Sequence, residues 1–165
     1  MINYHNGCLF KYIESEKFNG SCIICHCVND ISVMGSGFVV PLYTKWPIVK
    51  QLYHQWDMSL GKTQIIIVGD SLVGGKDIFV ANMCAQSGIC SKSTGPRSKV
   101  SSKPIRYASL VRCMEDVAHY VRMYKIDNIV APMFGSDRAG GTWDFIVELI
   151  YEIWKDLNVT ICRIN

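Results

Sequence analysis

The stretch that decides the fold is Met133-Phe134-Gly135-Ser136-Asp137-Arg138-Ala139-Gly140-Gly141-Thr142-Trp143. It follows an apolar, strand-like run at residues 128–132 and precedes a helix-like pattern that starts at Trp143. Three glycines in seven residues permit positive φ and a close approach of the backbone to a ligand. The free N–H groups that open the next helix carry partial positive charge. This pattern predicts a phosphate-binding loop at a strand-to-helix junction, with an ordinary tight turn as the alternative.

A second glycine-rich junction, Asn-Asp-Ile-Ser-Val-Met-Gly-Ser-Gly, occupies residues 29–37. The preceding run at 21–28 is continuously apolar, which is typical of a strand buried on both faces. Residues 38–46 then have helical spacing, and Pro47 restarts a helix that runs to about Trp56. Two such loops at the ends of strands predict that a diphosphate is held from both sides.

The rest of the chain alternates between strand and helix patterns. An edge strand is predicted within residues 1–9, a core strand at 64–68 that pairs antiparallel with 77–83, and a closing strand at 159–164. Apolar residues at helical spacing predict helices that begin at Pro104 and at Trp143. The alternation predicts a three-layer α/β/α fold, in which a mixed central sheet of about six strands carries helices on both faces. Ligands of such sheets bind outside the carboxyl ends of the strands, where both glycine-rich loops fall.

Length and composition are those of a single domain over residues 1–165, with 49% hydrophobic and 19% charged residues. A formal net charge of +3 suits an anionic ligand but falls short of the basic stripe of a nucleic-acid groove. The sequence has neither a run of eighteen apolar residues nor a signal-peptide pattern, so a cytoplasmic protein without a membrane partner is expected. Its eight cysteines lie mostly in apolar runs and are predicted to be free thiols.

One cysteine pattern resembles a cofactor site. Cys22-Ile23-Ile24-Cys25-His26 fits the C-x-x-C-H motif of covalent haem attachment, but it lies in a strand pattern of a chain without an export signal. Zinc is disfavoured because residues three apart on a strand point to opposite faces and no second Cys/His pair follows at finger spacing. We therefore predict no metal and no cofactor.

The only long irregular segment is residues 86–103, which is rich in Ser, Gly and Lys. Its basic residues predict contacts with phosphates, and a solvated surface loop is the alternative. These residues are Lys92, Arg97, Lys99 and Lys103.

With both loops placed, the sequence resembles the macro domain family. Within that family it is similar to the small branch that includes the yeast-type ADP-ribose-1″-phosphate phosphatase and the terminal ADP-ribose protein glycohydrolase. The resemblance covers almost the whole chain and follows the family's order and spacing. It rests on His26-Cys27-Val28-Asn29 with Met34-Gly35-Ser36-Gly37, on residues 81–86, on Lys103-Pro104-Ile105-Arg106-Tyr107, on Pro132-Met133-Phe134-Gly135-Ser136, and on Ala139-Gly140-Gly141-Thr142-Trp143.

The resemblance implies a cleft that binds ADP-ribose. Gly35-Ser36-Gly37 is expected to lie against the distal ribose and the diphosphate, and residues 135–142 to wrap the diphosphate from the other side. Asn29 is expected to contact the distal ribose. The predicted ligand-binding residues are Asn29, Met34, Gly35, Ser36, Gly37, Gly135, Ser136, Arg138, Ala139, Gly140, Gly141 and Thr142.

The sequence departs from the family pattern at three places. Cys8 follows Gly7 where many macro domains carry an Asp that holds the adenine amino group. Residues 82–84 lack the lysine that the glycohydrolase uses, which disfavours a mechanism through a lysyl adduct. Thr142 precedes Trp143 where related phosphatases often carry an Asp.

Two functions remain open at this point. The first is hydrolysis of an ADP-ribose derivative, either ADP-ribose-1″-phosphate or an ADP-ribosyl link to protein or nucleic acid. It needs an activated water, for which His26, by the resemblance, and Asp137 are the candidate catalytic residues. His26 is otherwise a satisfied histidine on a strand, and Asp137 a helix-proximal cap or a partner of Arg138. The second function is that of a non-catalytic reader or sponge for ADP-ribose-type ligands and ADP-ribosylated partners.

Overall fold

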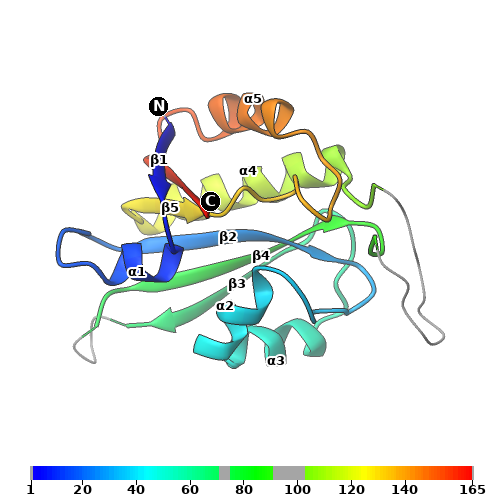
Figure 1. The fold of residues 1–165 in the computed structure, drawn as a ribbon, viewed down its shortest axis with the longest axis horizontal. Coiled ribbons are helices and arrows are strands. Elements are labelled where there is room, and N and C mark those ends of the chain that lie inside the picture. The colour runs from blue at the N-terminus through cyan, green and yellow to red at the C-terminus, as the bar shows by residue number, and fades with distance from the viewer. Residues whose placement is uncertain (1, 71–74, 91–102, 165) are drawn as a thin grey trace.

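A six-stranded sheet forms the centre of the protein, as the computed structural model shows for residues 2–70, 75–90 and 103–164 (Figure 1). Its strand order is β1-β6-β5-β2-β4-β3. All neighbouring strands are parallel except β3, which runs antiparallel to β4, so the sheet is mixed. The strands are β1 (Ile2–Asn6), β2 (Cys22–Asn29), β3 (Thr63–Gly69), β4 (Ile78–Gln86), β5 (Asn128–Ala131) and β6 (Val159–Arg163).

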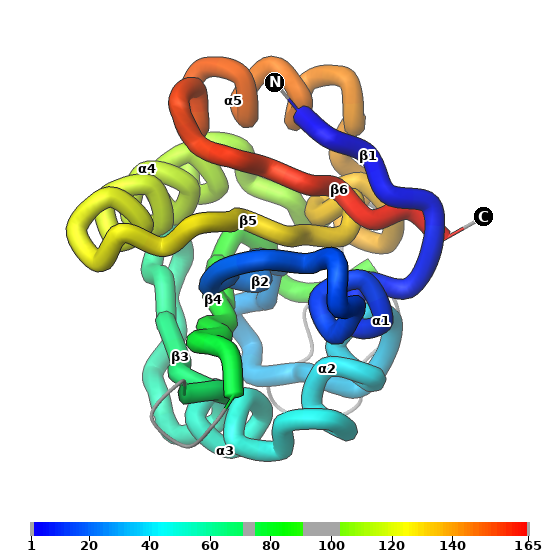
Figure 2. The backbone as a smooth tube through the Cα atoms, turned by 90° about the vertical axis from the view of Figure 1, so that its left-hand side faces the viewer, coloured from blue at the N-terminus to red at the C-terminus, as the bar shows by residue number. Residues whose placement is uncertain are grey.

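Helices cover both faces of this sheet, as Figure 2 shows from the side. The long helices α4 (Tyr107–Tyr124) and α5 (Trp143–Ile153) pack on one face. The short helices α1 (Leu9–Glu14), α2 (Val39–Lys45) and α3 (Ile48–Gln55) lie on the other. The predicted three-layer α/β/α architecture with a six-stranded mixed sheet is therefore confirmed.

Strand β2 is buried on both faces, as its continuous apolar run predicts. Ile23 and Cys25 belong to the core beneath α4 and α5, whereas Cys22 and Ile24 belong to the core beneath α1, α2 and α3. Because successive side chains of a strand alternate between faces, Cys22 and Cys25 are separated by the sheet. All eight cysteines are free thiols in this structure.

Two predicted elements differ from the structure. Strand β3 is an edge strand rather than a core strand, and the Ile67 side chain on it is 62% exposed. Helix α4 begins at Tyr107, not at Pro104, because the preceding residues pair with other parts of the chain: Ile105 forms a bridge with Gln86 and donates its N–H to Ala139. In the long segment predicted to contact phosphates, residues 91–102 lie outside the described residues.

The positions of β2 and β5 create the place for a ligand. The two strands are adjacent and parallel, and the chain leaves them toward opposite faces, to α2 after β2 and to α5 after β5. Such a switch point opens a crevice at the carboxyl ends of the strands. Both glycine-rich loops therefore lie at one edge of the sheet, as the sequence predicts.

Candidate functional site

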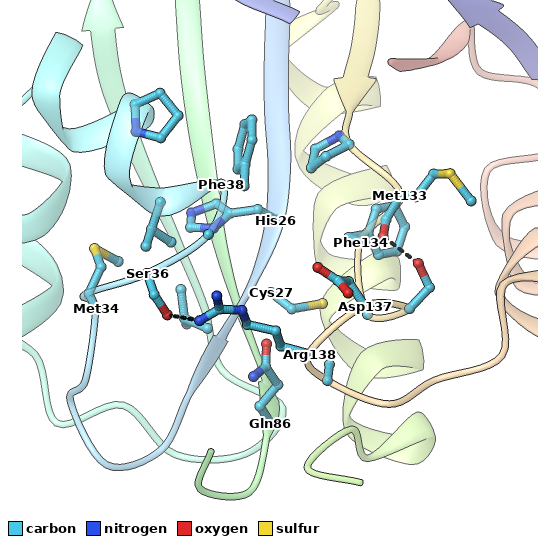
Figure 3. A pocket seen from close by; sticks show the side chains of 18 of the residues that line it. His26, Cys27, Met34, Ser36, Phe38, Gln86, Met133, Phe134, Asp137 and Arg138 are labelled. Atoms are coloured by element: carbon cyan, nitrogen blue, oxygen red, sulfur yellow. Dashed lines mark hydrogen bonds between the residues drawn. The ribbon is translucent and has the colours of Figure 1, made fainter. Parts of the chain in front are cut away.

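A cleft of about 850 Å³ opens at this edge, between the loops that follow β2 and β5 (Figure 3). One wall contains Asn29 and residues 33–39, and the other contains residues 132–139. The cleft also reaches the junction of β1 and α1 at residues 7–10 and the end of β4 at Gln86. The structure thus brings the two predicted loops together around one cavity.

The loop after β2 is shaped by the side chain of Asn29. Its Oδ1 accepts hydrogen bonds from the backbone N–H groups of Ile31 (3.2 Å) and Val33 (3.1 Å), while its Nδ2 donates to the oxygen of Val33 (2.7 Å). The hydroxyl of Tyr53, on α3, donates to the Asn29 backbone oxygen (2.8 Å) and lies 2.9 Å from Oδ1. Since an amide nitrogen has two hydrogens, Asn29 keeps one donor for a ligand while it holds the loop.

The same loop leaves free space in front of its glycines. A Cβ atom added at Gly35 or at Gly37 would meet no atom within 4 Å. Gly37 has φ +81°, a conformation that L side chains rarely adopt, so its backbone requires glycine. Gly35 has no such requirement. The missing side chain at Gly35 therefore serves to keep the wall of the cleft open.

The loop after β5 closes on itself. The Gly141 N–H donates to the oxygen of Gly135 (2.8 Å), and a Cβ atom on Gly141 would lie only 2.2 Å from that oxygen. The Thr142 N–H donates to the Tyr107 hydroxyl (2.9 Å). Gly135, Ser136, Asp137, Arg138 and Ala139 line the cleft, whereas the predicted contacts Gly140, Gly141 and Thr142 lie outside its lining.

Two charged residues of this loop are exposed at the cleft. Nη1 of Arg138 donates to Oγ of Ser36 at 2.5 Å, which joins the two loops across the mouth (Figure 3). Asp137 lies on the same wall, and its backbone oxygen accepts from the Gly140 N–H. Among the described residues Asp137 forms no ion pair with Arg138.

His26 lies in the cleft wall at one end of a buried row of polar side chains. Its Nε2 is 2.5 Å from Oδ1 of Asn82, whose Nδ2 donates to Oε1 of Gln64 (3.0 Å). Nε2 of Gln64 donates to the Leu52 backbone oxygen (2.8 Å). Because a backbone oxygen can only accept, the direction of every bond in the row is fixed. His26 must therefore donate from Nε2, which leaves Nδ1 as an unprotonated acceptor.

The surroundings of His26 also keep its ring neutral. Burial disfavours the charged imidazolium and lowers the His26 pKa to about 4, against a smaller upward effect of the hydrogen bond to Asn82. The ring of Phe38 lies 5.8 Å away, centroid to centroid. At neutral pH His26 therefore offers a hydrogen-bond acceptor and no positive charge.

One end of the cleft, beside β1 and β6, is lined by a thiol-bearing, mostly apolar group of residues: Gly7, Cys8, Leu9, Phe10, Cys162, Arg163 and Ile164. Burial raises the pKa of the Cys162 thiol to about 11, and the nearby Cys8 adds to that shift. No carboxylate lies at this end, because Asp137 is the only acidic residue among those described in the cleft lining.

Several lining residues escaped the sequence-based prediction. Cys27 and Gln86 lie at or near the carboxyl ends of β2 and β4. Because ligands of such sheets bind at the carboxyl ends of the strands, the predicted strands were a sufficient signal for both residues. Phe10 and Phe38 stack across the cleft wall at 5.8 Å, with their planes only 7° apart. Nothing local in the sequence indicates that contact, because Phe10 lies on α1 and Phe38 immediately precedes α2.

The described part of the chain meets neither the requirements of a metal-binding cluster nor those of a membrane-spanning helix. Nowhere in it do three or more His, Cys, Asp or Glu side chains gather as a group able to hold a metal ion. None of its five helices has the length and apolar character that crossing a membrane requires.

The comparisons with known proteins rest on structure. The chain matches no protein-family model and no curated protein significantly. A protein of unknown function from Bacteroides thetaiotaomicron is 30% identical, with a TM-score of 0.78 over 99% of this chain and 98% of that one. A macrodomain protein from Streptomyces coelicolor is 25% identical, with a TM-score of 0.74 over 98% of both chains.

A Trypanosoma brucei macrodomain, solved in complex with ADP-ribose, shares the fold at 10% identity. Its TM-score is 0.61, and the match covers 99% of this chain and 63% of that one. The T. brucei structure shows the fold alone, whereas the similarity to the S. coelicolor protein over nearly the whole of both chains shows that this chain belongs to the macro domain family.

Proposed function

We propose that the cleft binds ADP-ribose and that the protein hydrolyses a derivative of it. The observation that carries the proposal is the meeting of two glycine-rich loops, residues 33–37 and 135–139, around one cavity at a sheet switch point. Backbone N–H groups in such loops bind phosphates without a side chain. The T. brucei macrodomain solved with ADP-ribose supports this choice of ligand.

The shape of the cleft suggests an orientation for the nucleotide. The diphosphate would lie between the two loops, since they face each other in the middle of the cleft. The base would lie toward Cys8 and Cys162, whose surroundings are apolar. The distal ribose would then lie toward Asn29 and Gln86, at the ends of β2 and β4.

The proposed reaction is hydrolysis at the distal ribose, either of ADP-ribose-1″-phosphate or of an ADP-ribosyl link to protein or nucleic acid. A base must take a proton from the attacking water. Asp137 is the better candidate, because its carboxylate is exposed in the cleft lining, whereas His26 is buried and its Nε2 is bonded to Asn82. We assign His26 the role of an acceptor that orients a ribose hydroxyl. Eight free thiols favour a reducing compartment such as the cytoplasm.

The test is a pair of assays on the same protein. Release of phosphate from ADP-ribose-1″-phosphate and of ADP-ribose from modified protein or DNA should be measured for wild type, His26→Gln and Asp137→Asn. We expect Asp137→Asn to abolish turnover while binding of ADP-ribose persists. If wild type binds ADP-ribose but turns over none of these substrates, the protein is a non-catalytic reader or sponge.

A further inference from the structure

Two cysteine side chains lie together at the end of the cleft beside β1 and β6. Cys8 is the residue that precedes α1, and Cys162 lies near the end of β6. Both residues line the cleft. Burial, and secondly the nearby Cys8, raise the pKa of the Cys162 thiol to about 11. Such an electrostatic effect requires that the two thiols are neighbours.

The way in which α1 packs on β6 accounts for this proximity. The Gly7 N–H donates to the Arg163 oxygen (2.8 Å), so α1 starts beside the carboxyl end of β6 (Figure 2). Further along the helix, the Tyr12 hydroxyl lies 3.5 Å from Oγ1 of Thr160. Helix α1 therefore runs back along β6, in the direction opposite to that of the strand.

The helix and the strand also bring the two cysteines to the same level. Cys8 precedes Tyr12 by four residues, which is about 6 Å along a helix. Cys162 follows Thr160 by two residues, which is about 6.6 Å along a strand, and points to the same face. Because Cys162 packs in one core cluster with Leu9 of α1, that face is the one that α1 covers. The Cys8 and Cys162 side chains therefore lie next to each other between α1 and β6.

The two thiols differ in their access to solvent. Cys8 is partly exposed, whereas Cys162 is buried. A buried thiol with a raised pKa reacts slowly with a dissolved oxidant, because the thiolate is the nucleophile. It can still react with a partner that is held beside it, since proximity raises the effective concentration. Cys8 is therefore the first of the two to react with an oxidant, and Cys162 the second.

We propose that Cys8 and Cys162 form a redox-active dithiol site whose reversible disulfide closes the base end of the cleft. The oxidant is a small disulfide such as oxidised glutathione. The Cys8 thiolate attacks one sulfur of the oxidant, which releases one small thiolate and leaves a mixed disulfide on Cys8. The Cys162 thiolate then attacks the Cys8 sulfur and expels the second small thiolate. Two electrons pass from the cysteines to the oxidant, and the two cysteine protons end on the two released thiols.

Formation of this bond would narrow the cleft at its base end. A disulfide holds its two sulfur atoms about 2.0 Å apart, which is closer than any non-bonded contact. The junction of β1 with α1 is thereby drawn toward β6, and both border the space that the proposed function assigns to the base. The effect on ligand binding rests on the proposed function, whereas formation of the disulfide does not.

The test is oxidation of the folded protein by oxidised glutathione, followed by alkylation of the remaining thiols and peptide mass spectrometry. Every protein carries Cys90→Ser, because Cys90 is exposed and would form a mixed disulfide of its own. Cys8→Ser and Cys162→Ser each remove one member of the pair. The matched control is Cys27→Ser, which removes another partly exposed thiol of the cleft lining.

The parent protein should lose two hydrogen atoms and yield a pair of peptides cross-linked between Cys8 and Cys162, and so should the Cys27→Ser control. Cys162→Ser should stop at the mixed disulfide on Cys8, and Cys8→Ser should leave Cys162 as a thiol. Affinity for ADP-ribose, measured by calorimetry, should fall about tenfold when the parent protein is oxidised and return with dithiothreitol. In Cys8→Ser the affinity should not depend on the oxidant.

The results that would overturn the inference are distinguishable. A mixed disulfide that persists on Cys8, or full alkylation of both cysteines after oxidation, would exclude the dithiol site and leave the proposed function intact. A cross-linked protein that binds ADP-ribose as tightly as the reduced one would show that the bond does not close the base end. Failure of both forms to bind ADP-ribose would overturn the proposed function, while the mass spectrum would still decide whether the disulfide forms.

Discussion

Nε2 of His26 lies 2.5 Å from Oδ1 of Asn82, directly opposite it in the pairing of β2 with β4. Asn82 in turn stands opposite Gln64 in the pairing of β4 with β3. The three neighbouring strands β2, β4 and β3 therefore carry one continuous row of hydrogen bonds from the cleft to α3. Because all three side chains are buried, the row both fixes the His26 tautomer and contributes to stability.

The first prediction concerns pH. His26 should remain neutral in the folded protein at every pH above about 5, since burial lowers its pKa to about 4. The unfolded chain, with a histidine pKa of about 6.5, binds more protons between these values. The free energy of unfolding should thus fall as the pH drops from about 6.5 to 4, and His26 should account for on the order of 3 kcal/mol of that fall. Above pH 6.5 the contribution of His26 should not change with pH.

Imidazole NMR titration of the folded protein measures the pKa directly, and urea unfolding at several pH values measures its effect on stability. His26→Gln should lose this part of the pH dependence. A native His26 that titrates near pH 6.5 would refute the prediction.

The second prediction concerns the polar row. Asn82→Leu should lower the free energy of unfolding by roughly 2–3 kcal/mol, because it leaves the His26 donor and the Gln64 oxygen buried without partners. A double-mutant cycle with Gln64→Leu tests the coupling: the two changes together should cost less than their sum. Strictly additive effects in chemical unfolding would mean that the row contributes nothing as a unit.

The third prediction compares two glycines of the cleft loops. Gly141→Ala should destabilise the protein by roughly 1–3 kcal/mol, because its Cβ would collide with the Gly135 oxygen at 2.2 Å. Gly35→Ala should leave the melting temperature unchanged, since its Cβ would meet nothing within 4 Å. It should nevertheless weaken ADP-ribose binding about tenfold by filling the ligand's space. Unaltered affinity in Gly35→Ala would place the ligand elsewhere.

The fourth prediction concerns the base. Cys8→Asp should strengthen ADP-ribose binding about tenfold, because a carboxylate at the base end would accept a hydrogen bond from the adenine amino group. Cys8→Ser is the neutral control and should change little. The inosine analogue lacks that amino group, so a gain of the same size with it would contradict the explanation.

The sequence predicts the architecture well where local pattern and tertiary contact agree. The apolar run of β2 and the glycines at 35, 37 and 135 indicate a buried strand and two loops at one sheet edge, and the structure has both. The pattern of residues 64–68 could not reveal an edge strand, because strand order depends on pairing between distant segments. The start of α4 depends likewise on the bridge of Ile105 with Gln86.

The site was only partly predictable for the same reason. The role of Asn29 as a brace for its own loop depends on Tyr53, which lies 24 residues away. The direction of the hydrogen bonds in the His26 row is set by the backbone oxygen of Leu52, and no pattern of side chains in the sequence identifies that acceptor. Residues 140–142 lie outside the cleft lining, and Thr142 among them is bonded to the Tyr107 hydroxyl, a contact between distant segments.

The most direct test of the central claim is amide NMR of the labelled protein titrated with ADP-ribose. If the two loops close on the diphosphate, the largest shifts should occur together at the N–H groups of Gly35, Ser36, Gly37, Gly135 and Ser136, and saturate at one equivalent. Shifts confined to one loop, or none at millimolar nucleotide in a folded protein, would contradict the account.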